Sequence, residues 1–192
     1  LSDQEVMTAI ASEYTQPEGM FFPDTYLFAK GVSDLVIYRQ AHAMMLTRLN
    51  TAWEKRDPAL PYKDAYEALT MASIVEKETG QKSERSMIAA VFVNRLRLGM
   101  MLQTDPTVIY GMGTNYQGNI RKKDLETDTP YNTYTRTGLP PTPIALPGVQ
   151  SLTAALAPAK SQALYFVARG NGTSKFSDNL PDHNRAVNQY QR

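Results

Sequence analysis

Apolar residues recur at helical spacing through the first half of the chain, and proline or glycine separates the periodic segments. The pattern predicts helices over residues 2–13, 33–55, 63–79 and 83–98. Ser2, followed three residues later by Glu5, predicts a capping box for the first helix. Gly80 and Gly99 are expected to end the third and fourth helices, since glycine is the usual residue beyond a helix C-terminus.

The second half has a different character. Residues 103–148 are rich in Gly, Pro, Thr, Asn and Tyr and lack long periodic runs, but their aromatic and apolar content argues against disorder. We expect ordered loops with short hairpins that frame a groove. Beyond them, the pattern predicts a helix capped by Ser151, strands at 164–168 and 175–176, and a last helix containing residues 184–191. The predicted class is α+β, with residues 1–192 forming a single domain.

Composition narrows the functional classes. Lys and Arg number 20 against 19 Asp and Glu, so the net charge of +1 offers no field that would attract nucleic acid. Cysteine is absent, which removes disulfides and thiolate chemistry. No apolar run approaches the roughly 20 residues that span a bilayer. The chain begins at Leu1, which is not an initiating Met, and this indicates a piece of a longer protein.

Several catalytic classes lack their motifs. The two histidines, His42 and His183, lie far apart and without the spacing of a zinc site, so no metal is predicted. A serine-nucleophile elbow, a Walker loop and a dinucleotide fingerprint are also missing, and no cofactor is expected. His183 precedes the last predicted helix, where a cap is favoured over a ligand-facing donor.

Carboxylate chemistry remains, and Glu76 is its first candidate. Helical geometry places Glu76 on one face with Ala72, Leu69 and Ala65. Apolar surroundings would raise its pKa from about 4.3 towards roughly 6 to 7, as a general acid requires. On the helix alone, a structural carboxylate paired with Arg or Lys is the favoured interpretation.

A two-carboxylate mechanism needs a partner for Glu76. Glu78 lies about 200° around the helix and cannot act on the same bond. Asp105, Asp128 and Glu18 are candidates, and the sequence selects none of them. Polar residues of the loop segment could bind a sugar, with a turn or a cap as the alternative for each; they are Gln103, Asp105, Tyr131, Asn132 and Thr133.

Blocks along nearly the whole chain resemble the MltG/YceG-like endolytic murein transglycosylases. The matching blocks are Glu18–Gly19, Phe22–Tyr26, Met71–Thr79, Val91–Leu96, Leu102–Gly111, Tyr131–Tyr134, Gly138–Ile144, Tyr165–Val167 and His183–Asn184. Several long blocks in the right order form a specific signature. The groove is accordingly expected to be a saccharide groove.

The resemblance implies cleavage of the β-1,4 bond between N-acetylmuramic acid and N-acetylglucosamine. The family's single glutamate falls on Glu76, which would protonate the glycosidic oxygen and then accept the proton of the muramic C6 hydroxyl. A 1,6-anhydro end results, and no second carboxylate is required. Gln103, Asp105, Tyr131, Asn132 and Thr133 would position sugar or shape the groove. Glu78 would support them or pair with a cation such as Arg95.

The resemblance also implies location and partners. It implies a catalytic portion at the periplasmic face of the inner membrane, with an N-terminal anchor and a LysM-like region upstream of Leu1. Nascent peptidoglycan strands, which the enzyme would terminate or trim, and the polymerases that make them (penicillin-binding proteins) are the expected partners. Two alternatives stay open: a muramidase that cleaves with water, and a non-catalytic peptidoglycan-binding module.

Overall fold

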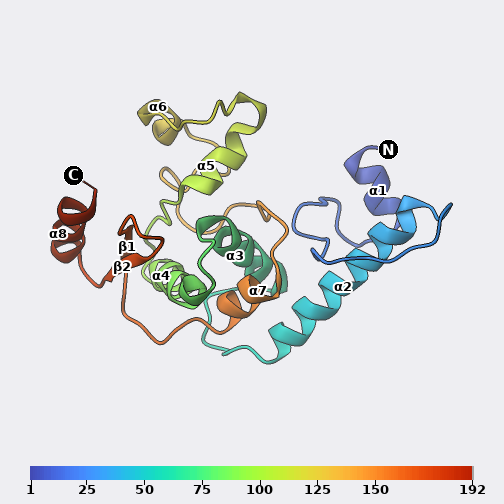
Figure 1. The fold of residues 1–192 in the computed structure, drawn as a ribbon, viewed down its shortest axis with the longest axis horizontal. Coiled ribbons are helices and arrows are strands. Elements are labelled where there is room, and N and C mark those ends of the chain that lie inside the picture. The colour runs from blue at the N-terminus through green and yellow to red at the C-terminus, as the bar shows by residue number, and fades with distance from the viewer. Residues whose placement is uncertain (192) are drawn as a thin grey trace.

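The computed structural model describes residues 1–191 and is helix-rich with one two-stranded antiparallel sheet (Figure 1), which confirms the α+β class. The α-helices are α1 (Asp3–Ala9), α2 (Asp34–Glu54), α3 (Ala65–Glu78), α4 (Arg85–Arg97), α5 (Asp105–Met112), α6 (Lys122–Glu126), α7 (Val149–Leu156) and α8 (Leu180–Tyr190). Two 3₁₀ turns, η1 (Lys82–Glu84) and η2 (Gly113–Asn115), and the strands β1 (Tyr165–Ala168) and β2 (Ser174–Ser177) complete the set.

Helix α3 forms the centre of the fold. Every residue from Ala68 to Val75 is buried, and the two polar ones, Thr70 and Ser73, donate their hydroxyl hydrogens to backbone carbonyls of the same helix. It packs against α7 and α4, and also against α2 and α5. Figure 1 shows α3, α4 and α7 grouped in the middle, with α2 running outward beneath α1. The last turn of α3, which carries Glu76 and Glu78, therefore emerges from a rigid core.

Local signals predict most helix ends correctly. Ser2 and Glu5 form the expected capping box, although α1 ends at Ala9 because Ala11 adopts a left-handed conformation with φ of 59°. Gly99, with φ of 66°, follows α4 as predicted. The prediction for Gly80 is wrong: Thr79 is already extended, with φ of −143°, and takes the chain out of α3 without a left-handed glycine.

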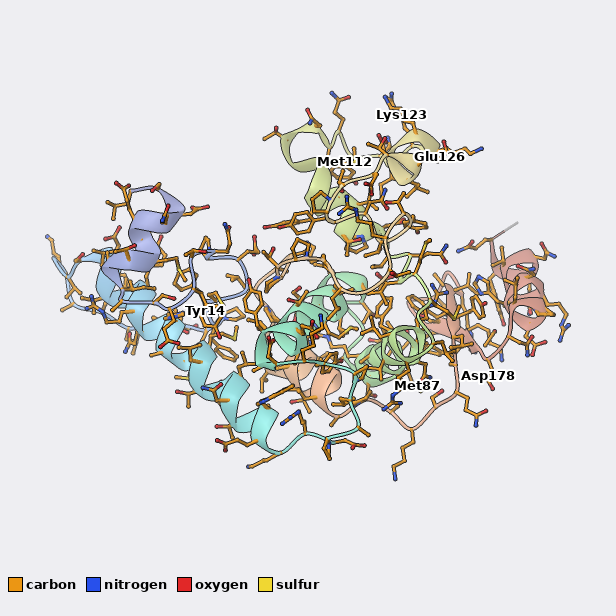
Figure 2. All side chains as sticks on the ribbon, turned by 180° about the vertical axis from the view of Figure 1, so that it is seen from behind. Tyr14, Met87, Met112, Lys123, Glu126 and Asp178 are labelled. Atoms are coloured by element: carbon orange, nitrogen blue, oxygen red, sulfur yellow. The ribbon has the colours of Figure 1, made fainter. Side chains whose placement is uncertain are left out.

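The loop-rich segment contains short helices, so the predicted hairpins are wrong. Asp105 and Pro106 begin α5, because proline in a first helical turn has its φ preset and lacks only a donor that has no partner there. Helices α5 and α6 project from the core at the top of Figure 1. Figure 2 shows Met112, Lys123 and Glu126 on this projection.

The C-terminal part follows the predicted order with shifted boundaries. Helix α7 begins at Val149 with Gly148 as its N-cap, so Ser151 lies inside the helix and is not its cap. Strands β1 and β2 pair with Phe166 opposite Phe176, and α8 packs against both. Helix α8 starts at Leu180, which places His183 in its first turn. Along residues 1–191, no helix has both the length and the apolar character that crossing a bilayer demands.

Candidate functional site

Two cavities open beside the last turn of α3, and each contains one of its glutamates. The larger, of about 580 Å³, is lined by Glu78 together with residues of α4, α5, α8 and the β-hairpin. The smaller, of about 370 Å³, is lined by Glu76 together with the starts of α4 and α7. Since Glu76 and Glu78 point about 200° apart on the helix, they serve different spaces.

The carboxylate of Glu76 is held by donors on both oxygens. Its Oε1 accepts a hydrogen bond from Arg85 Nη2 at 3.0 Å. Its Oε2 accepts from the Gly148 backbone N–H at 3.0 Å and from the Ser151 hydroxyl at 2.7 Å. The apolar surroundings predicted for Glu76 are therefore wrong, because the chain brings α4 and α7 onto its open side. The ion pair with an arginine is the structural arrangement that the helix alone favoured.

This arrangement joins three helices at one point. Arg85 is the first residue of α4, and Gly148 is the N-cap of α7, where backbone N–H groups lack helical partners. The side chain of Glu76 is 26% exposed and that of Arg85 is 12% exposed, so the pair is largely shielded from water. With both oxygens hydrogen-bonded, one of them to a guanidinium, the Glu76 carboxylate is held in its ionised form, which is unsuited to donating a proton.

Glu78 lies in contrasting surroundings. Its Oε2 accepts a short hydrogen bond of 2.5 Å from the Thr104 hydroxyl. Burial raises the pKa of Glu78; the Thr104 hydrogen bond opposes this shift, and the negative charge of Asp105 adds to it. None of the ion pairs within residues 1–191 includes Glu78. The predicted pairing of Glu78 with Arg95 is therefore wrong.

Asp105 places a second carboxylate in the larger cavity. It is exposed at the start of α5, and its Oδ1 accepts a hydrogen bond of 2.6 Å from the Tyr134 hydroxyl. Burial and this carboxylate both raise the pKa of Tyr134. The cavity thus combines the Glu78 carboxyl, which favours protonation, with the Asp105 carboxylate, which the Tyr134 hydroxyl stabilises. Nothing in the sequence indicated that Glu78 and Asp105 would share one cavity.

Gln103 lines the same cavity as Glu78 and Asp105, and its backbone conformation is unusual. Its φ of 51° lies in the left-handed region, which is uncommon for a residue other than glycine and is often found at functional sites. The Gln103 N–H donates to the Thr133 carbonyl at 3.0 Å, and its amide oxygen accepts from Arg95 Nη1 at 3.3 Å. The exposed side chain lines the larger cavity with Glu78 and Asp105.

Three further residues predicted to bind substrate support the loops and line neither cavity. Asn132 is 1% exposed, and its amide donates to the carbonyls of Asp124, Leu125 and Thr127. Thr133 is 2% exposed and accepts from the Thr104 N–H at 3.1 Å. The Tyr131 hydroxyl contacts that of Thr142 at 2.8 Å. The structure therefore groups Gln103 and Asp105 with Glu78, away from Asn132, Thr133, Tyr131 and Glu76.

His183 belongs to the larger cavity, although the sequence favoured a capping role. Its ring stacks on Tyr165 with 5.0 Å between centroids. Burial lowers the pKa of His183, and the positive charge of Arg95 adds to the effect. The imidazole is thus neutral near pH 7. Its place in the first turn of α8, which contacts β1, was the signal that could have predicted this position. Within residues 1–191, no cluster of three or more His, Asp or Glu residues could hold a metal ion.

Comparison with known proteins gives a consistent result along the chain. The sequence profile described as the YceG-like family matches residues 1–189. The chain is 43% identical over 175 residues to the endolytic murein transglycosylase of Bacillus subtilis strain 168, covering 90% of this chain and 48% of that protein. It is 32% identical over 180 residues to the protein of the same name from Streptococcus pneumoniae D39, covering 90% of this chain and 32% of that protein.

A solved structure shows the same fold. A crystal structure of a yceG-like protein from Listeria monocytogenes superposes with a TM-score of 0.77 at 39% identity, covering 94% of this chain and 59% of that one. The chain thus spans about half or less of the length of the named transglycosylases. The family match extends over nearly every residue and settles the relationship: this chain belongs to the YceG-like family.

Proposed function

We propose that this chain cleaves peptidoglycan glycan strands internally, as a lytic transglycosylase. The observation that carries the proposal is Glu78, a partly buried carboxyl with a raised pKa in the larger of the two cavities, which Asp105 and Gln103 also line. General acids that work near neutral pH require such surroundings. The names of the Bacillus and Streptococcus relatives support the same substrate and reaction.

The mechanism that we propose needs one carboxyl for two proton transfers. Protonated Glu78 donates its proton to the glycosidic oxygen as the bond between that oxygen and muramic C1 breaks. The muramic C6 hydroxyl attacks C1, and its proton passes to the Glu78 carboxylate. The products are a 1,6-anhydro end and a new 4-hydroxyl on N-acetylglucosamine. Atoms balance without water, and Glu78 returns to its protonated form.

Asp105 assists this cycle through its charge. An ionised carboxylate near Glu78 disfavours loss of the Glu78 proton before substrate arrives. It would also stabilise positive charge developing at the sugar ring. Tyr134 keeps Asp105 in place through the 2.6 Å hydrogen bond. Glu76, the residue that the family resemblance selected, is on this view the support that fixes the end of α3, because both of its oxygens are already bound.

Asp105 also gives a specific reason to test a second function, hydrolysis by a muramidase. Two carboxyl groups in one cavity are what a water-dependent glycosidase uses. Digestion of purified sacculi followed by mass spectrometry separates the two reactions, because hydrolysis products are heavier by one water than anhydro products. We expect anhydro ends; reducing ends alone would establish hydrolysis, and binding without soluble fragments would establish a non-catalytic module.

Location and partners are part of the same proposal. Peptidoglycan lies outside the cytoplasmic membrane, so we propose action there, at the periplasmic face and through an anchor upstream of Leu1. Glycan polymerases, the penicillin-binding proteins, would supply the nascent strands that the enzyme terminates. Co-purification of the full-length protein with a polymerase from membranes tests the partnership, and recovery of the protein without any polymerase would count against it.

A further inference from the structure

The amide of Gln103 has one fixed orientation, and this orientation suggests what it recognises. The inference deepens the proposed function and depends on it. The buried residues Leu102 and Thr104 flank Gln103, and Thr133 bonds to the backbone N–H groups of Gln103 and Thr104. The left-handed backbone of Gln103 is therefore held from both sides, while its side chain remains exposed in the larger cavity.

Arg95 decides which end of that amide faces the cavity. The guanidinium of Arg95 is buried, at 7% exposure, and donates to the carbonyls of Leu164 at 2.7 Å and Leu102 at 3.0 Å. It also donates to the Gln103 side chain at 3.3 Å. Because a guanidinium can only donate, the Gln103 atom that faces it must be the amide oxygen. The amide NH₂ is turned away from Arg95.

Two hydroxyl donors next to Gln103 are already used. The Thr104 hydroxyl donates to Glu78, and the Tyr134 hydroxyl donates to Asp105. No hydrogen bond joins the Gln103 NH₂ to another residue of the described range 1–191. Beside the carboxyl groups of Glu78 and Asp105, the Gln103 NH₂ is therefore a donor without a protein partner in this cavity. A ligand group that only accepts hydrogen bonds can be satisfied here by Gln103.

We propose that the Gln103 NH₂ donates to the acetamido carbonyl of an N-acetylated sugar beside the scissile bond, and that Arg95 positions it. The acetamido carbonyl is a strong acceptor that distinguishes N-acetyl sugars from their amino-sugar counterparts. Gln103 thereby selects acetylated strands, and Arg95 acts only through Gln103. A de-N-acetylated sugar would leave the Gln103 NH₂ without its acceptor in a partly enclosed site, which is costly, so we expect a large difference between the two strands.

The test compares two substrates with two enzymes. Glycan strands are used as isolated and after de-N-acetylation, and kcat/KM is measured for the native chain and for Gln103→Met, a neutral variant of similar shape. We expect the native chain to prefer acetylated strands by about tenfold or more. In Gln103→Met the preference should fall towards one. Chemical re-acetylation of the treated strands should return the kcat/KM of the native chain to its value for strands as isolated. An unchanged preference in Gln103→Met would overturn the assignment.

Arg95 is tested by the same ratio. Arg95→Lys keeps the buried charge but has no planar fork to hold the amide and the carbonyls together. We expect Arg95→Lys to prefer acetylated strands less than the native chain does. The double variant Arg95→Lys with Gln103→Met should show the same preference as Gln103→Met alone. An Arg95→Lys protein that is folded by circular dichroism and keeps the native preference would remove Arg95 from the proposal. Should it fail to fold, the Gln103→Met comparison decides the Gln103 assignment alone.

Failure of the proposed function can be told apart from failure of this inference. A native chain that releases nothing from either substrate refutes the proposed function. Binding still tests Gln103 in that case: co-sedimentation with acetylated and de-acetylated strands should show the same preference in a Glu78→Gln background. Equal binding to both strands would refute the role of Gln103.

Discussion

Glu76 and Glu78 lie two residues apart on one helix turn, and their surroundings are opposite. Glu76 has both oxygens bound by Arg85, Gly148 and Ser151. Glu78 has one short hydrogen bond from Thr104, no ion pair within residues 1–191, and a pKa raised by burial. The comparison teaches that burial alone does not make a carboxyl an acid. The number and charge of the donors around each carboxyl distinguish the two: Glu76 has three donors including a guanidinium, whereas Glu78 has one neutral hydroxyl.

The largest expected difference concerns turnover. Glu78→Gln keeps the shape of the side chain but removes the titrating proton, so we expect release of soluble fragments from sacculi to fall by about 10²–10⁴-fold. Glu76→Gln should retain activity within about tenfold per folded molecule. Thermal denaturation of both variants supplies the folded fraction for the comparison. The reverse ranking would return the catalytic role to Glu76, where the family resemblance placed it.

A loop variant tests whether Asn132 shapes the site or meets sugar. Asn132→Ala removes donors from three carbonyls and an acceptor from the Tyr134 N–H. With an unsatisfied buried group costing about 1–3 kcal/mol, we expect a loss of roughly 2–4 kcal/mol in the free energy of unfolding. Urea denaturation measures it. Unchanged stability combined with a raised KM would instead indicate direct contact with substrate.

The support role of Glu76 predicts a smaller stability effect. Glu76→Gln leaves the largely shielded Arg85 without its carboxylate but retains an oxygen for Gly148 and Ser151. Because the pair is partly exposed, we expect a loss of about 1–3 kcal/mol, below that of fully buried pairs. Chemical denaturation of Glu126→Gln, which breaks the exposed i,i+4 pair with Lys122, serves as the matched control and should change by less than about 0.5 kcal/mol.

The smallest predicted effect is a pH dependence with a definite sign. Since the pKa of Glu78 is raised in the fold, its contribution to stability is complete below the pKa of the unfolded chain and is lost as pH rises through the folded value. Glu78→Gln is neutral at every pH. Its thermal midpoint should therefore exceed that of the native chain near pH 8 and match it near pH 4. Equal midpoints at both pH values would contradict the raised pKa.

Sequence reasoning predicted the helical core because its signals are local. The apolar positions of α3 and α4, the Ser2 cap and the glycine after α4 all lie within a few residues of what they determine. Helix α5 was missed for a different reason: Asp105–Pro106 is read as a turn, whereas an acidic residue and a proline also start helices. The sequence could therefore have predicted that α5 starts at Asp105.

The sequence could not show whether Glu76 or Glu78 is the catalytic residue. Helical periodicity gives the angle between Glu76 and Glu78 but does not say which face meets a cavity. The partners that bind Glu76 include Gly148 and Ser151, which are 72 and 75 residues away in the sequence. Thr104, the partner of Glu78, is 26 residues away. Gln103 and Asp105 were found by their residue types, but their grouping with Glu78 depends on how α5 packs on α3.

The junction at Glu76 has a consequence for mutagenesis. One carboxylate there ties the end of α3 to the beginnings of α4 and α7, so its loss would loosen the frame that carries Glu78. In a single-temperature activity assay close to the thermal midpoint, variants at either glutamate would be scored as inactive. Cooling would separate them: the Glu76 variant recovers activity as it refolds, while the Glu78 variant stays inactive at every temperature.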